Sequence, residues 1–326
     1  MTARKAPASI VITCFTDQRW SQLAAAIESA LGQTMAPQEV IVVVDHNDDL
    51  LFRVGGRWPE VSVMANRFDR GASGARNTGA FQARSPVVAF LDDDAVADPK
   101  WLELLVRCFE DESVVGAGGG VTAAWVDRQP AWFPAEFAWV VGASYRGLPE
   151  DVSEVRNVWA ENMAVRTDSF VAAGGFRLGF GKVGTRSSPE DTELCIRMTL
   201  GRGRWLYAPA AQVAHHVPAE RTTFRFFLRR CYVEGVGKAA LAGLTSSDSL
   251  DAERDYVRQL VPRAIGRNLR EAARGRRLSP AARAGAMVAG VASAGVGYAR
   301  GRLATRPGAT SVAMTAGSAA AASRES

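Results

Sequence analysis

The chain has 326 residues, 47% hydrophobic and 22% charged, which is the composition of a globular protein. This length predicts one large catalytic domain with an appendage. The formal net charge of +5 is modest for this size, so we expect no nucleic-acid partner. The four cysteines lack C-x-x-C or metal-ligand spacing, and the N-terminal apolar run is too short for a signal peptide. These features favour a cytosolic protein with reduced thiols.

Four apolar runs in the first hundred residues have the length of strands. They are continuous rather than alternating, as is typical of strands buried on both faces of a parallel sheet. Apolar residues at helical spacing predict a helix from Trp20 to Leu31, and Asp98 with Pro99 predicts the start of another. This α/β alternation predicts a doubly wound sheet with its ligand at the carboxyl ends of the strands. The four runs are SIVITCF (9–15), VIVVVD (40–45), VSVM (61–64) and VVAFLD (87–92).

Carboxylates follow two of these runs, at Asp45 and at Asp92, Asp93 and Asp94. If the strand continues, side-chain alternation directs Asp92 and Asp94 to one side and Asp93 to the other. Two carboxylates on one side are suited to Mg²⁺ or Mn²⁺, which leaves positions for substrate phosphates. The alternative is a solvated acidic loop that caps the next helix.

Two later segments add candidate residues. RGASGARNTGA (70–80) places Arg76 before the fourth strand, where it could meet a phosphate, although a tight turn that opens a helix is an equal alternative. Glu190 and Asp191 precede a helical pattern, where an acidic pair is either catalytic or only favourable to the helix dipole. No G-x-G-x-x-G follows the first strand, which argues against an NAD-dependent oxidoreductase.

The ordered set of motifs resembles family 2 glycosyltransferases, which are inverting enzymes of the GT-A fold, a Rossmann-like and mostly parallel sheet flanked by helices. The resemblance covers residues 8 to 240, approximately, and is carried by SIVITCFTD, EVIVVVD, RGASGARNTGA, VVAFLDDDA, ENMAVRTDSFVAAGGF, PEDTELCIR and VAHHVP.

The resemblance implies a role for most of the candidate residues. Each role concerns the nucleotide-sugar donor, the divalent metal ion or the proton of the acceptor. Thr13 and Phe15 would border the nucleoside, Asp45 would accept a hydrogen bond from uracil N3, Arg76 and Asp93 would lie near the diphosphate, Asp92 and Asp94 would bind the metal, and Asp191 would be the catalytic base.

Two further groups match the acceptor side and the metal side of such enzymes. Trp159, Glu161 and Asn162, with Glu190, correspond to the acceptor region, although a tryptophan here is equally suited to the core. One imidazole of the pair at 215–216 could bind the metal, and we assign this role to His216; a polar strand end is the alternative.

The composition changes after the catalytic region, which we place at 1–240. Residues 241–304 predict a helical extension, and residues 305–326 predict a disordered tail. The uncharged stretch 284–299 is short for a membrane span. One helix carries an arginine stripe, which either faces solvent on a packed helix or contacts an anionic membrane. The stripe consists of Arg263, Arg267, Arg270, Arg274 and Arg277.

Taken together, the motifs predict a metal-dependent inverting glycosyltransferase that uses Mg²⁺ or Mn²⁺ and a UDP-sugar. The acceptor is expected to be a hydroxyl of a polyprenyl-linked or cell-envelope glycan, at the inner face of the cell membrane. The alternatives are transfer to a soluble specialised metabolite and nucleotide-sugar binding without catalysis. A nucleotidyltransferase would need a basic glycine-rich loop after the first strand, which is absent.

Overall fold

The computed structural model describes residues 7–183, 186–187, 189–200, 203–244, 251–275 and 278–304. Arg277, the segment 246–249 within the predicted helical extension and the predicted disordered tail at 305–326 lie outside the described residues.

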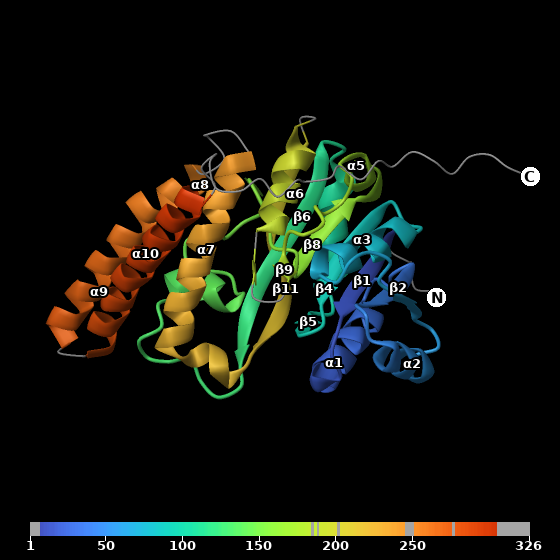
Figure 1. Cartoon of the computed structure of the whole chain (residues 1–326), viewed down its shortest axis with the longest axis horizontal. Coiled ribbons are helices and arrows are strands. Elements are labelled where there is room, and N and C mark those ends of the chain that lie inside the picture. Colours follow the sequence, from blue (N-terminus) through green and yellow to red (C-terminus); the bar gives the residue numbers. More distant parts are fainter. Residues whose placement is uncertain are drawn as a thin grey trace, which may run out of the picture.

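Within this part of the chain, the centre of the molecule is a nine-stranded sheet of order β3-β2-β1-β4-β8-β6-β11-β5, with β7 paired to β11 (Figure 1). Strands β3, β2, β1 and β4 are parallel to one another, and β6 is parallel to β11. Strand β8 runs antiparallel to both β4 and β6. The prediction of a mostly parallel sheet is confirmed. The strands are β1 (Ala8–Cys14), β2 (Glu39–Val44), β3 (Ser62–Ala65), β4 (Val87–Asp92), β5 (Ala95–Ala97), β6 (Val114–Trp125), β7 (Ser153–Val155), β8 (Asn162–Arg166) and β11 (Arg204–Val217), while β9 (Lys182–Val183) and β10 (Arg186–Ser187) form a separate pair.

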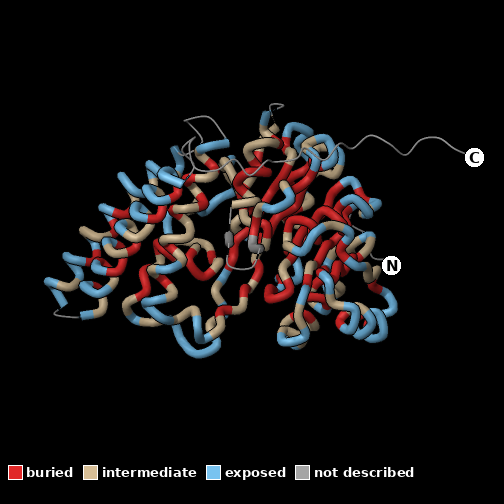
Figure 2. The backbone as a smooth tube through the Cα atoms, in the orientation of Figure 1, coloured by how far each residue is buried: buried red, intermediate tan, exposed pale blue. Residues whose placement is uncertain are grey.

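Helices cover both faces of the sheet. One core joins alternate strand residues such as Ile10 and Ile12 to Leu23 and Trp101, and a second core on the other face joins Val11 to Leu194 and its neighbours. The strands are therefore buried on both sides, as the continuous apolar runs predict (Figure 2). The helices of these layers are α1 (Trp20–Leu31), α2 (Asp48–Arg57), α3 (Ala72–Gln82), α4 (Trp101–Arg107), α5 (Thr167–Ala172) and α6 (Glu190–Thr199), with 3-10 turns η1 (Asp17–Arg19), η2 (Cys108–Glu110) and η3 (Ala135–Val141).

Local sequence explains two of these elements and corrects a third. Helix α1 has the predicted bounds, with Gly32 at its C-cap. Helix α3 packs closely on β1 because Gly79 has no Cβ, which would lie 2.5 Å from a methyl of Val11. The predicted cap at Asp98 is wrong: α4 begins at Trp101 after Lys100, and the Asp98 carbonyl instead accepts the Trp101 amide in a preceding turn.

A helical arm packs against one end of the sheet. Its helices are α7 (Phe224–Leu244), α8 (Asp251–Asp255), the π-helical segment η6 (Tyr256–Leu260), α9 (Val261–Gly275) and α10 (Leu278–Ala304), with η4 (Ala219–Thr222) before α7. Helices α7 and α10 lie side by side (Figure 1), and their aromatic and aliphatic residues share a third core with η3. Residue 240, the predicted end of the catalytic domain, falls inside α7. No described helix of the arm or elsewhere is long and apolar enough to cross a membrane.

Candidate active site

The carboxyl ends of β1, β2 and β4 bring predicted site residues to one edge of the sheet. Thr13 on β1 is in register with Val43 on β2 and with Asp92 on β4. Asp45 directly follows β2, and its amide donates to the Cys14 carbonyl. The parallel strands thus place these residues where a ligand is expected in such a sheet.

Asp45 is buried and its carboxylate is held by the protein on both oxygens. Its Oδ1 accepts a hydrogen bond of 2.6 Å from Asn66 Nδ2, and its Oδ2 accepts one of 2.9 Å from the Gly71 amide. His46 Nδ1 lies 2.9 Å from Oδ1. A carboxylate has about four lone-pair positions, so one remains for a ligand donor such as an imide N–H.

An exposed aromatic ring follows β1 at the same edge of the sheet. Phe15 is 51% exposed at the end of β1, and the guanidinium of Arg19 lies 5.6 Å from its ring centre. The predicted contact of Phe15 and Thr13 with a nucleoside is not tested by these distances and stays a prediction.

The three consecutive carboxylates do not follow the predicted alternation. Strand β4 ends at Asp92, and Asp93 and Asp94 lie in a turn, so the rule for an extended chain does not apply. Asp93 Oδ1 and Asp94 Oδ2 both contact Arg19 Nη1, at 2.9 and 3.0 Å. Asp92 instead receives a hydrogen bond of 2.7 Å from Arg76 Nη2. Arg19 was not predicted as a site residue, because only the turn brings it to these carboxylates.

His215 is the histidine whose side chain reaches the acidic cluster. Its Nε2 lies 3.3 Å from Asp94 Oδ1, whereas His216 donates only its backbone amide, to the Asp94 carbonyl. The two side chains point to opposite faces of β11 because successive strand residues alternate. The structure therefore favours His215 over the predicted His216 as the imidazole at this position.

The pair of Asp94 and His215 is stabilised in its charged form. Burial acts to raise the pKa of Asp94, but the hydrogen bond and charge of His215 lower it to about 2. Burial acts to lower the pKa of His215, but Asp94 and the nearby Glu161 raise it to about 9. For neighbouring Asp93, burial raises the pKa to about 7 against the opposing charge of Arg19.

Arg76 connects the end of β4 to the start of α6. It is buried, with Nη2 2.7 Å from Asp92 Oδ1 and Nη1 3.3 Å from Glu190 Oε1. This bridge brings the acidic pair of α6 to the same edge of the sheet as Asp92. The glycine-rich segment is thus a helix start, and its arginine contacts carboxylates of the site.

Glu190 and Asp191 are both half-buried and lie in the first turn of α6. Burial raises the pKa of Asp191, and the positive charge of Lys238 in α7 acts against this rise. Burial and the charge of Asp191 raise the pKa of Glu190 to about 7. The two carboxyl groups titrate as a pair, so one of them can hold a proton near neutral pH.

The predicted acceptor residues divide into one site residue and two packing residues. Burial raises the pKa of Glu161 to about 7, with the charges of His215, Asp92 and Asp191 nearby. Asn162 is buried, and its amide bonds Trp101 Nε1 and two backbone carbonyls at 2.7–2.9 Å, which gives it a packing role, while its acceptor contact stays a prediction. Trp159 packs against the sheet core, 6.2 Å from the Tyr145 ring.

The cluster has the chemistry of a site for a hard divalent cation. Its donors are carboxylate oxygens and one imidazole nitrogen, which suit Mg²⁺ or Mn²⁺. Three buried atoms, Asp93 Oδ2, Glu161 Oε1 and His215 Nδ1, have no hydrogen-bond partner among the described residues. No three acidic, histidine or cysteine side chains in that part of the chain already converge as a metal site. Asp94 and His215 would fit two positions of such an ion once His215 has lost its proton, since only the neutral imidazole binds a metal.

Comparison with known sequences defines the class of protein. The profile of "Glycosyl transferase family 2" matches residues 9–172. A glucosyl-dolichyl phosphate glucuronosyltransferase of Haloferax volcanii is 34% identical over 259 residues, which are 78% of this chain and 82% of that protein. A pre-mycofactocin glycosyltransferase of Mycobacterium tuberculosis is 29% identical over 62% of this chain, which spans only 42% of that protein. The chain belongs to glycosyl transferase family 2 and is a glycosyltransferase.

Solved structures agree on the fold. A mannosyltransferase from Pyrobaculum calidifontis in complex with GDP-Man and Mn²⁺ superposes with a TM-score of 0.58 at 17% identity, covering 94% of this chain and 89% of that one. GalNAc-T7 with UDP, GalNAc and Mn²⁺ superposes with a TM-score of 0.52 at 17% identity, covering 74% of this chain and 52% of that one. The fold is therefore GT-A, as predicted.

Proposed function

We propose that this enzyme transfers a sugar with inversion from a UDP-sugar to an acceptor hydroxyl, with Mg²⁺ or Mn²⁺ bound at the sheet edge. The observation that carries the proposal is the Arg76 bridge, because it brings the acidic pair of α6 to the carboxylates that follow β4. Two neighbours in fold were crystallised with a nucleotide or nucleotide-sugar and Mn²⁺, which supports the same donor chemistry here.

The donor side is assigned to the residues around β1, β2 and β4. Asp94 and His215 would hold the ion, which supplies positive charge to the diphosphate as the nucleotide leaves. Asp45 would accept from uracil N3 beside the exposed ring of Phe15. In this assignment Asp92 does not bind the ion. It stays paired with Arg76, whose guanidinium keeps the Asp92 carboxylate oriented.

Asp191 is assigned as the general base. It takes the proton of the acceptor hydroxyl while the acceptor oxygen forms a bond to C1 and the bond from C1 to the diphosphate oxygen breaks. The electron pair of the broken bond leaves with the nucleotide. The raised pKa of Asp191 suits this role because a carboxylate in a poorly solvated position is a stronger base than one in water.

The acceptor is assigned as a sugar linked to a lipid phosphate. The Haloferax relative is named for a glucosyl-dolichyl phosphate acceptor, and it matches most of both chains. A soluble specialised metabolite is the second candidate, supported by the shorter match to the pre-mycofactocin enzyme.

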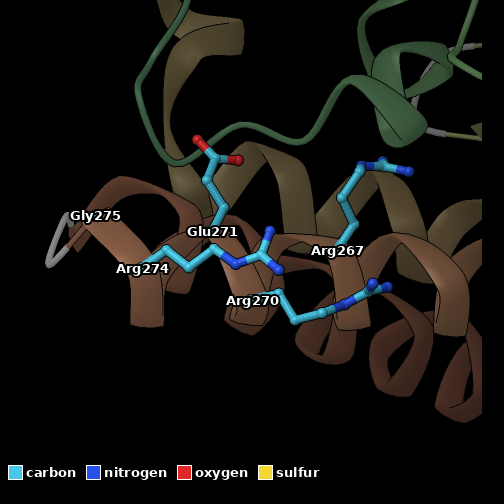
Figure 3. Close-up of a pocket in the computed structure, with 5 residues that line it drawn as sticks. All are labelled: Arg267, Arg270, Glu271, Arg274 and Gly275. Atoms are coloured by element: carbon cyan, nitrogen blue, oxygen red, sulfur yellow. The ribbon is translucent and has the colours of Figure 1, made fainter.

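The arm offers a surface for the membrane that would hold such a lipid. Helix α9 packs through Val261 and Ala264, which leaves its arginines outward. Figure 3 shows Arg267, Arg270 and Arg274 around a hollow of about 520 Å³ on this helix. These residues with Arg263 form the basic surface, and exposed Leu269 and Leu278 lie on the same arm. Cations beside apolar side chains match an anionic lipid surface.

A transfer assay with a defined acceptor tests the proposal. The protein is incubated with a panel of UDP-sugars, a glucosyl phosphoprenol and Mg²⁺ or Mn²⁺, and the product is analysed by mass and by the NMR coupling of its new anomeric proton. The expected product carries one added sugar of inverted configuration, and EDTA prevents its formation. Retained configuration, or transfer that EDTA leaves intact, would contradict the assignment.

A further inference from the structure

A carboxylate of the arm is clasped by two cations beside the assigned base. Glu253 of α8 receives two hydrogen bonds of 2.6 Å from Arg156, one on each carboxylate oxygen, and its Oε1 lies 2.8 Å from Lys238 Nζ. Its side chain is 28% exposed, and Lys238 is more buried. Burial acts to raise the pKa of Glu253, but Arg156 and Lys238 lower it to about 2.

The charges of both cations act on Asp191, and neither cation comes from the donor side: Lys238 belongs to α7 of the arm, and Arg156 follows β7. Helix α6, which carries Asp191, lies between α3 and α7 in Figure 1. Arg76 approaches from α3, whereas Lys238, the opposing charge that acts most strongly on the pKa of Asp191, comes from α7. Arg156, which precedes the Trp159 segment, also senses the charge of Asp191. The donor phosphates are assigned to the other side, around Asp94.

The acceptor must lie against Asp191, because this residue takes its proton. A group bonded to the acceptor on the side of α7 therefore meets Arg156 and Lys238. Arginine binds carboxylate and phosphate with the same two-pronged geometry, so a phosphate suits the position that the Glu253 carboxylate now fills. Arg230 and Lys238 flank Glu234 at 2.9 and 3.4 Å, so three cationic side chains, including Arg156, gather around Glu234 and Glu253.

We propose that Arg156 and Lys238 form a binding site for a phosphate group of the acceptor, and that Glu253 occupies this site as an intramolecular substitute. The inference rests on the proposed function and deepens it, since it adds a charged acceptor group to the site. A phosphate-bearing acceptor displaces Glu253, and a neutral acceptor does not.

The simplest alternative is an ion pair that only anchors α8 to the catalytic domain. An anchor and a binding site differ in one measurable respect. Removing the carboxylate from an anchor lowers stability alone, whereas removing it from an occupied site also exposes an anion site that ligands can fill.

The test compares Glu253→Gln with Asp251→Asn by thermal unfolding in rising inorganic phosphate, with UDP and Mg²⁺ present throughout. Asp251 lies in the same short helix, pairs with Arg254 and gives the same change in charge. We expect an apparent Kd for phosphate on the order of 10-fold lower in Glu253→Gln, the effect of one charge-assisted hydrogen bond. Adding Arg156→Gln to Glu253→Gln should remove this gain.

A second titration identifies the source of the phosphate. Citronellyl phosphate, a short and soluble prenyl phosphate, replaces inorganic phosphate in the same titration. Tighter binding of the prenyl phosphate supports a lipid-linked acceptor, and equal binding supports a small phosphorylated acceptor; both agree with the site.

Equal phosphate affinity in the two variants would overturn the inference. Should Glu253→Gln not fold, Glu253→Asp serves instead, because its shorter carboxylate cannot clasp Arg156 equally and should give a smaller gain of the same sign. Stabilisation by UDP with Mg²⁺ is recorded in the same samples. If UDP with Mg²⁺ does not stabilise the protein, the proposed function is contradicted. If it does, but Glu253→Gln binds phosphate no more tightly, only this inference is contradicted.

Discussion

The sheet edge and the helical arm carry their charges in different ways. At the sheet edge Arg76, Asp93 and Asp94 are each less than a tenth exposed, and each contacts an opposite charge. On α9 Arg263, Arg270 and Arg274 are exposed, and Arg267 is about half exposed although it pairs with buried Glu136 of η3. Buried charges are costly unless they are paired, whereas exposed charges cost little.

The comparison separates two kinds of functional surface. The buried network fixes the positions of individual atoms, as chemistry requires, and each change there should have a large effect. The exposed stripe acts through its summed charge, so single changes there should have small and additive effects. The following predictions test this contrast from the strongest expected effect to the weakest.

The largest effect is expected at the assigned base. Asp191→Asn should lower the turnover number by about 10²- to 10⁴-fold, since it removes general-base help. Nucleotide affinity should change by less than about 2-fold, because no donor contact is lost. Steady-state transfer and nucleotide titration check the two parts, and turnover near that of the native enzyme would transfer the role to Glu190.

The next effect concerns the metal position. Asp94→Asn should weaken Mn²⁺-dependent nucleotide binding by about 10- to 100-fold. Asp93→Asn is the matched control, because it lies in the same turn and contacts the same Arg19 but not His215. Calorimetric titration of UDP with and without Mn²⁺ measures both. A loss of equal size in the control would mean that the turn, rather than the ligand, is responsible.

For each residue changed, the exposed stripe should give a smaller effect than the metal position, and salt should weaken it. Arg270→Gln with Arg274→Gln should weaken binding to vesicles with anionic lipid by about 30-fold, from about 1 kcal/mol for each arginine. The control is Arg53→Gln with Arg84→Gln, two exposed arginines of the catalytic domain. Vesicle sedimentation measures how much of each double variant binds to the vesicles. Equal binding of the two would contradict the proposed membrane contact.

The mildest test uses pH. Asp191 must be ionised to act, and burial raises its pKa, so kcat/KM should fall about tenfold for each pH unit below the apparent pKa of the acidic pair. Glu190, with a pKa raised to about 7, repels the charge of its neighbour. Glu190→Gln should therefore move this acid limb to lower pH. If the acid limb of kcat/KM does not move, the group that titrates there does not belong to the pair of Glu190 and Asp191.

Much of the fold could be predicted because it depends on local pattern. The continuous runs at 9–15, 40–45 and 87–92 became strands buried on both faces, and α1 has its predicted bounds. The start of α4 was misplaced, since the carbonyl of Asp98 rather than its side chain closes the preceding turn.

The sequence indicated which residues lie at the site better than it indicated which groups those residues contact. Asp45, Arg76 and Asp94 do lie at the expected edge, because strand ends meet there. Arg19 and Asn66 carry no motif, and only the folded chain brings them to the carboxylates. The choice between His215 and His216 depends on the register of β11, which a single sequence does not contain.

The most direct measurement of the central claim is the thermal shift of the protein with a panel of nucleotides and nucleotide-sugars, with and without Mn²⁺. Ligands that bind the folded chain stabilise it by RT ln(1 + [L]/Kd), about 2.7 kcal/mol at a hundredfold excess over Kd. We predict stabilisation by UDP or a UDP-sugar that requires Mn²⁺ or Mg²⁺ and is lost in Asp94→Asn. Stabilisation by no nucleotide, or equal stabilisation without the metal, would contradict the account.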